Sequence, residues 1–108
     1  MQELISKWIE ALRSGEYNQV RYWLEKDGCY CATGVLGTII KADIGTHTFL
    51  SDCKIDTELK SFLQSPVNIL GEVMSIESHI IDMNDSGYSF NEIADWLENY
   101  LYSWKSLV

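Results

Sequence analysis

The sequence is poor in basic residues, histidine and proline. Lysine and arginine together number 8 against 16 acidic residues, and there are 2 histidines and 1 proline. The formal net charge of -8 disfavours nonspecific binding to DNA or RNA, because both partners would be negatively charged. No apolar run approaches the length of a membrane span, no secretory signal opens the chain, and no linker divides it. We therefore expect a single globular domain over residues 1–108.

Cysteine is also scarce, and its arrangement offers little chemistry. Three cysteines cannot all pair within one chain, and without a signal segment a reducing compartment is expected. Cys29 and Cys31 lie two residues apart rather than in a C-x-x-C knuckle, so zinc binding with Cys53 is not predicted. A calcium loop starting at Asp82 would need a glutamate at its twelfth position, which is Ile93. We expect no metal, no cofactor and no enzyme activity.

Apolar and aromatic residues are abundant. They make up 46% and 12% of the chain, which is enough for a hydrophobic core. The four tryptophans and six tyrosines exceed what so small a core can cover, so some should face a partner subunit or a ligand. This excess predicts a homo-oligomer.

The charges are distributed unevenly along the chain. Residues 1–54 carry seven acidic and six basic residues, whereas residues 55–108 carry nine acidic and two basic residues. Both arginines, Arg13 and Arg21, lie in the nearly neutral half, where a pocket for an anionic ligand is therefore expected. The acidic residues of the second half are most simply a solvated surface, or alternatively a surface that mimics DNA or binds a basic protein. They are Asp82, Asp85, Glu92, Asp95 and Glu98.

Periodicity predicts a mainly α, small α+β fold, with about four to five helices and one short β-hairpin near residues 20–31. The fourth helix follows from Ser65 as N-cap and Pro66 at the first helical position. The last begins at the capping box of Ser89 and Glu92 and carries an apolar stripe as far as Trp104. The predicted helices are 3–14, a short buried helix from Thr33, a turn capped by Asp56 or Thr57 that runs through Leu63, 66–83 and 90–105.

Strands are predicted in two places. Asp27-Gly28 is a favoured type I′ hairpin pair, since both central residues need positive φ, and it would join strands at 20–26 and 29–31. A second short strand is expected at 46–50, within an otherwise irregular stretch.

The stretch "YCATGVLG", residues 30–37, combines a thiol, a hydroxyl and two glycines. A nucleophilic Cys31 would need a base, and a phosphate-binding loop would need a lysine after Gly37, which is absent. A buried thiol at a strand-to-helix corner is the simpler interpretation, and close packing would explain the glycines.

The segment "ALRSGEYNQVRYW", residues 11–23, has the groups needed to hold a nucleotide. Arginine binds phosphate, glutamine contacts a base edge, and tyrosine or tryptophan stacks on a base. On a strand, the four alternate residues from Tyr17 to Trp23 would share one face. Alternatively, the aromatic residues belong to the core and the arginines neutralise the acidic half. The candidate ligand-binding residues are Arg13, Tyr17, Gln19, Arg21 and Trp23.

The chain resembles a group of small proteins from tailed bacteriophages. Their pattern reads W-x-x-A-L-R-S-G-x-Y-x-Q-x-R-x-x-L, then C-C-L-G-V-L-C, then L-N-D-x-G-x-S-F-x-x-I-A-D-x-I-E. In the second block, Ala32, Thr33 and Gly37 depart from this pattern. The matching positions are Trp8, 11–15, Tyr17, Gln19, Arg21, Leu24, Cys31, 34–36, Asn84, Asp85, Gly87, Ser89, Phe90, 93–95 and Glu98.

The resemblance implies a viral protein that acts in the cytoplasm of the host cell. Small acidic phage proteins of this kind counter host defence, in some cases by sequestering the nucleotide messengers of CBASS or Thoeris immunity. We therefore expect a non-catalytic binder of a cyclic oligonucleotide or an ADP-ribose derivative. The alternative is an acidic inhibitor of a host defence protein or a nucleic-acid-binding protein, and an enzyme such as a phosphodiesterase is the third possibility.

Overall fold

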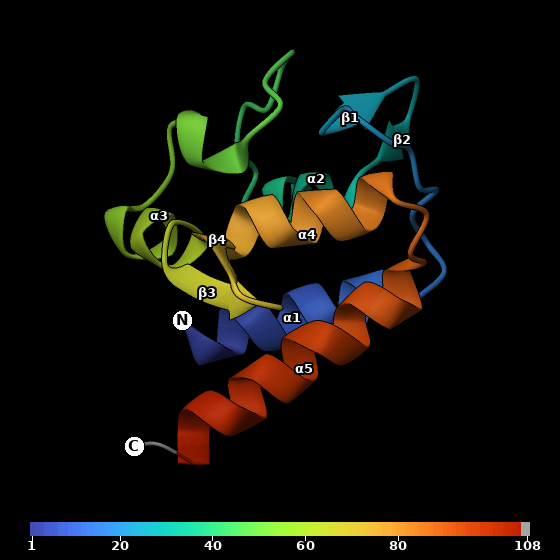
Figure 1. Ribbon diagram of the computed structural model, residues 1–108. Coiled ribbons are helices and arrows are strands. Elements are labelled where there is room, and N and C mark those ends of the chain that lie inside the picture. The colour runs from blue at the N-terminus through green and yellow to red at the C-terminus, as the bar shows by residue number, and fades with distance from the viewer. Residues whose placement is uncertain (107–108) are drawn as a thin grey trace.

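The computed structural model describes residues 1–106, with side chains as far as Leu101. These residues form five α-helices and two small antiparallel sheets, which confirms the predicted small α+β, mainly helical fold (Figure 1). The elements in chain order are α1 (Gln2–Arg13), β1 (Glu25–Lys26), β2 (Cys29–Tyr30), α2 (Ala32–Ile39), the 3-10 turn η1 (Leu50–Asp52), α3 (Thr57–Leu63), β3 (Pro66–Ile69), β4 (Glu72–Ser75), α4 (Ile76–Asp85) and α5 (Phe90–Ser106).

The helices pack as two pairs around one core. α1 lies along α5, while α2 packs against both α1 and α4. In Figure 1 the α2–α4 pair lies above the α1–α5 pair. Trp8 of α1 is fully buried, and its indole N–H donates to the carbonyl of Ala32 at 2.8 Å, so its polar atom is satisfied inside the core. The predicted apolar stripe of α1 is confirmed by its buried residues, Ile5, Trp8, Ile9 and Leu12.

The hairpin predicted near residues 20–31 is present but shorter than expected. Asp27 and Gly28 have φ values of 53° and 81°, the two positive values that a type I′ turn requires. Only Glu25–Lys26 and Cys29–Tyr30 pair as strands. The extension of the first strand back to residue 20 is therefore wrong.

The short buried helix predicted from Thr33 is α2, and its glycines mark close contacts. A Cβ atom on Gly34 would overlap the carbonyl oxygen of Leu24, and one on Gly37 would lie 2.7 Å from the Ile44 side chain. Close packing thus explains both glycines, as predicted.

The helix predicted over 66–83 is wrong in its first half. Residues 66–75 instead form the hairpin β3–β4, so the chain has two hairpins rather than the one predicted. Proline is tolerated at the start of a strand, and the β-branched residues Val67, Ile69 and Val73 favour strand over helix. The helix begins only at Ile76, after the β4 strand ends.

The strand predicted at 46–50 is also wrong. This stretch is a loop that leads into η1. The buried carboxylate of Glu77 on α4 accepts hydrogen bonds from the backbone N–H groups of Leu50 and Ser51. Burial raises the pKa of Glu77, against the opposing effect of these hydrogen bonds. A side chain distant in the sequence, rather than a neighbouring strand, therefore binds the backbone N–H groups at the end of this loop.

The predicted helix starts at Ser89 and Asp56 are confirmed. The Ser89 hydroxyl accepts from the Glu92 N–H at 3.1 Å, and the Glu92 carboxylate accepts from the Ser89 N–H at 2.9 Å. Asp56 caps α3 by accepting from the N–H groups of the second and third helical residues. Trp104, predicted on the apolar stripe of α5, lies outside the residues whose side chains are described.

Candidate ligand-binding site

The segment between α1 and β1 contains most of the predicted binding residues, but it is not a strand. It makes one isolated parallel bridge, between Gln19 and Tyr30, through two backbone hydrogen bonds of 2.8 and 2.9 Å. Side chains at the end of α4 make further hydrogen bonds with the segment. The expectation of one shared strand face is therefore wrong for Tyr17, Gln19, Arg21 and Trp23.

The buried amide of Asn84, near the end of α4, fixes the path of this segment. Its Oδ1 atom accepts from Gln19 Nε2 at 2.9 Å and from the Ala32 backbone N–H at 3.1 Å. Its Nδ2 atom donates to the Val20 carbonyl at 2.8 Å. One side chain thus joins the segment to α2 and α4. The sequence pattern does not predict this role, although a polar residue four positions after Ile80 on an apolar helix face is a signal of it.

Tyr22 has a backbone conformation that tyrosine rarely adopts. Its φ is 74°, and its side chain is 65% exposed, so the conformation places an aromatic ring on the surface. The Asp85 carboxylate stabilises this backbone by accepting the Tyr22 N–H at 2.9 Å. A left-handed conformation costs an ordinary residue about 1–2 kcal/mol, and such strain is often found where a surface has a function.

Arg21 lies in a small cleft beside the turn that follows α4. The cleft has a volume of about 220 Å³, and its lining residues also include Gln19, Asn84, Gly87 and Tyr88. Gly87 has a φ of 99°, and a Cβ atom there would lie 3.0 Å from Arg21 Nη2. Among the residues whose side chains are described, no carboxylate pairs with Arg21 within 4.0 Å.

A second hollow, of about 200 Å³, has an aromatic lining that includes Tyr22. Trp23 and Phe49 line it, and both are partly exposed. The Lys26 Nζ atom lies 5.1 Å from the centroid of the Trp23 ring, which gives this aromatic surface a cation as neighbour. Asp85 lines this hollow and Asn84 lines the Arg21 cleft, so the two depressions adjoin the same end of α4.

The structure separates Arg13 and Tyr17 from this site. Arg13 forms ion pairs with Asp95 at 2.6 Å and with Glu98 at 3.0 Å, both on α5. These hydrogen bonds, the one to Glu98 foremost, raise the pKa of Arg13. The Tyr17 ring packs edge-on against Tyr30, and its hydroxyl lies 3.3 Å from that of Thr38. The five predicted residues therefore divide among the Arg21 cleft, the aromatic hollow, an ion-pair cluster and a packing contact.

The comparison with protein families gives one match. The family model described as "Domain of unknown function (DUF8296)" matches residues 1–101. The chain belongs to this family. No curated protein and no solved structure matches it, so neither an activity nor a ligand comes to this DUF8296 chain from a characterised relative.

The side chains of this chain limit the chemistry that is possible at the site. Cys31 lines the aromatic hollow, but burial raises the pKa of its thiol and so disfavours the thiolate. Within the part of the chain that the structure describes, no three His, Cys, Asp or Glu residues group together as metal ligands. None of the described helices combines the length and apolar character needed to cross a membrane. Arg21 is the cation of the cleft, and Trp23 and Phe49 are the exposed rings of the hollow.

Proposed function

We propose that this protein binds a small nucleotide without converting it, and that it is a phage protein which sequesters a nucleotide messenger of host immunity in the host cytoplasm. The observation that carries the proposal is the position of Arg21, a cation without a carboxylate partner among the described side chains, beside exposed aromatic rings. In a chain with a net charge of -8, a cation left without a partner favours an anionic ligand.

The dimensions of the site suggest how a nucleotide would lie. Ligand pockets usually exceed about 300 Å³, and neither the 220 Å³ cleft nor the 200 Å³ hollow reaches that size. A nucleotide would therefore occupy both, with a phosphate at Arg21 and its base against Trp23 and Phe49. Stacking on aromatic rings contributes about 1–3 kcal/mol per base.

The lining residues favour binding over catalysis. No histidine lines either depression, and the carboxylate of Asp85 already accepts the backbone N–H of Tyr22.

The alternative, an acidic inhibitor of a host protein, has fewer free carboxylates than the sequence suggested. Asp95 and Glu98 are paired with Arg13, and Asp85 binds a backbone N–H group. Glu92 is used in the capping box of α5. Arg13 therefore offsets part of the charge of Asp95 and Glu98, while Asp85 and Glu92 keep theirs.

The proposal is tested by incubating the protein with a panel of cyclic oligonucleotides and ADP-ribose derivatives, removing free ligand, and then denaturing the protein by heat. We expect depletion of one ligand class from solution and its recovery intact after denaturation. Recovery of a chemically altered ligand would identify an enzyme. If no ligand is depleted, the nucleotide proposal is refuted and a protein partner is favoured.

A further inference from the structure

Two left-handed residues outside the candidate site point to an interface. The non-glycine residues with positive φ are Tyr22, Asp27, Lys41 and Leu70. Asp27 lies in a type I′ turn, where aspartate is tolerated, and Tyr22 belongs to the candidate site. Lys41 follows a helix end and Leu70 lies in a turn, where positive φ is common, but glycine or asparagine usually takes such positions. Strained positions of this kind are often found where a surface has a use.

Leu70 forms the tip of the β3–β4 hairpin. Leu70 and Gly71 have φ values of 53° and 89°, so they occupy the two central positions of a type I′ turn, in which asparagine would be preferred at the first position. The Leu70 side chain is 103% exposed, and the neighbouring Val73 is 68% exposed. Glu72 is the charged residue between them. The tip is therefore an apolar projection with one negative charge.

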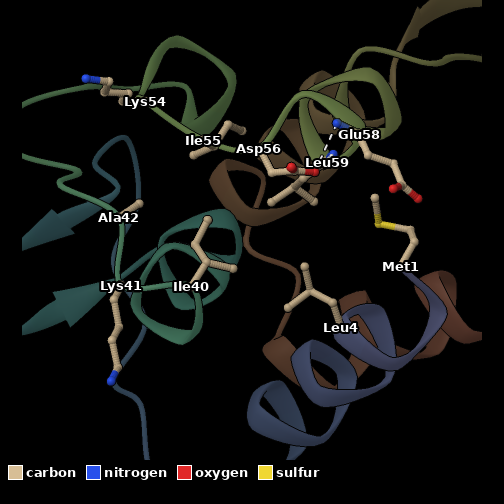
Figure 2. Close-up of a pocket in the computed structure, with 10 residues that line it drawn as sticks. All are labelled: Met1, Leu4, Ile40, Lys41, Ala42, Lys54, Ile55, Asp56, Glu58 and Leu59. Atoms are coloured by element: carbon tan, nitrogen blue, oxygen red, sulfur yellow. Dashed lines mark hydrogen bonds between the residues drawn. The ribbon is translucent and has the colours of Figure 1, made fainter.

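A groove with complementary properties lies between the beginnings of α1 and α3 and the end of α2 (Figure 2). Its volume is about 450 Å³. An apolar cavity of about 150 Å³ accepts a molecule as large as benzene, so the groove has room for an aliphatic side chain. Figure 2 shows its apolar side chains around one open space: Met1, Leu4, Ile40, Ile55 and Leu59.

The groove also has a positive rim. Lys41 and Lys54 line it with their ammonium groups directed outward (Figure 2), and neither pairs with a described carboxylate within 4.0 Å. Two carboxylates line the opposite side: Asp56 is occupied in capping α3, whereas Glu58 has no cation partner among the described side chains. Lys41 takes the position after α2 that usually belongs to glycine: its N–H bonds to the Thr38 carbonyl at 3.1 Å, in a Schellman arrangement. A cation is thus kept at this rim in spite of backbone strain.

We propose that the β3–β4 hairpin tip of one copy docks into this groove of a second copy. Leu70 enters the apolar space, and Glu72 lies against Lys41 and Lys54, so charges of opposite sign meet on the lysine side of the groove. Because each copy carries a tip and a groove, a two-fold dimer makes the contact twice. This interface lies apart from the Arg21 cleft and does not depend on the nucleotide proposal.

The first test substitutes Leu70→Asn and measures mass by light scattering at micromolar concentration. We expect the unaltered protein to be a dimer and the variant to dissociate at least about tenfold more readily, as for loss of an interface anchor. At high dilution the same variant should melt at a higher temperature than the unaltered protein, because asparagine fits the turn. Asp27→Asn, at the matching position of the other hairpin, is the control and should leave association unchanged. A monomeric unaltered protein, or a Leu70→Asn variant that associates normally, would overturn the proposal.

The second test exchanges charges between the two surfaces. Glu72→Lys and Lys54→Glu should each weaken association, since each variant alone brings like charges together. An equimolar mixture of the two should associate again, because every tip then meets a groove of opposite charge. Both residues are exposed, so neither change should prevent folding. A mixture that stays monomeric would show that the tip does not dock at Lys54 and would refute the assigned groove.

Discussion

The two arginines of this chain lie at opposite ends of one short segment and have opposite electrostatic surroundings. Arg13 closes α1 and is held by two carboxylates of α5, so its charge is already compensated. Arg21 lies against the turn after α4 without a carboxylate partner among the described side chains. The difference teaches that an arginine in an acidic protein indicates an anion site only when the fold leaves its charge uncompensated.

The arrangements that hold the two arginines also differ. Arg13 is held by exposed ion pairs, which contribute little to stability and weaken in salt. The segment of Arg21 is positioned by the buried amide of Asn84 and the carboxylate of Asp85, and the absence of a side chain at Gly87 leaves room for the Arg21 guanidinium. Substitutions can therefore change the environment of one arginine while leaving that of the other intact.

Asn84→Ala should have the largest effect. It leaves the buried Ala32 N–H and Val20 carbonyl without partners, so the free energy of unfolding should fall by about 3 kcal/mol. Urea denaturation of the variant measures this loss, and Asn91→Ala, at an exposed position on α5, is the control. The variant should also bind ligand poorly, while the Arg13 ion pairs remain. Equal stability of the two variants would contradict the role assigned to Asn84.

Gly87→Ala and Gly15→Ala form a matched pair, one beside each arginine. Both glycines have positive φ, so each alanine should cost about 1–2 kcal/mol of stability. Only Gly87 faces an arginine: its added Cβ would meet Arg21 at 3.0 Å, whereas nothing lies within 4 Å of one at Gly15. Thermal unfolding should therefore show similar losses, with reduced ligand affinity for Gly87→Ala alone. Equal affinities for the two variants would show that the Arg21 position does not matter for binding.

Ser89→Ala changes a position between the Arg13 ion pairs and the Arg21 cleft. Ser89 caps the helix that carries Asp95 and Glu98, and it follows Tyr88 of the Arg21 cleft. Loss of this N-cap should cost about 1 kcal/mol and leave ligand affinity unchanged. A variant with normal stability but no ligand binding would show instead that the hydroxyl contacts the ligand.

Asp95→Asn combined with Glu98→Gln should have the smallest effect on stability. It releases Arg13 from exposed ion pairs, and the expected loss is below about 1 kcal/mol. The loss should shrink further at high salt, where the charges are screened. A much larger loss in urea denaturation would mean that this cluster, rather than the helix packing beneath it, joins α1 to α5.

The two hairpins show what the sequence could predict. Asp27-Gly28 has the residues that a type I′ turn prefers, and its hairpin was predicted. Leu70-Gly71 forms the same turn with a residue that does not favour it, and Ser65-Pro66 resembles a helix start, so the second hairpin was missed. Local signals were reliable at Ser89, where the capping groups lie within one turn.

The candidate site was predicted less well, because its geometry depends on distant contacts. Sequence alternation predicts a shared strand face for Gln19 and Trp23, which the structure lacks. They lie near Arg21 because Asn84 and Asp85 hold the segment. Phe49 was not predicted, since its loop is fixed by Glu77 through hydrogen bonds to the next two residues. The local sequence places Arg13 in the last turn of a helix, where the helix dipole favours a cation, but it does not identify Asp95 and Glu98 as its partners.

Calorimetric titration of the folded Arg21→Ala and Arg13→Ala variants, with the ligand identified by the release experiment, tests the central claim most directly. Removal of a charge-assisted phosphate contact should cost Arg21→Ala about 2 kcal/mol or more, which is roughly thirtyfold in affinity. Arg13→Ala should bind ligand like the unaltered protein, because the guanidinium that it removes is paired with Asp95 and Glu98 of α5. Full-strength binding by a folded Arg21→Ala variant, or an equal loss in both variants, would contradict the account.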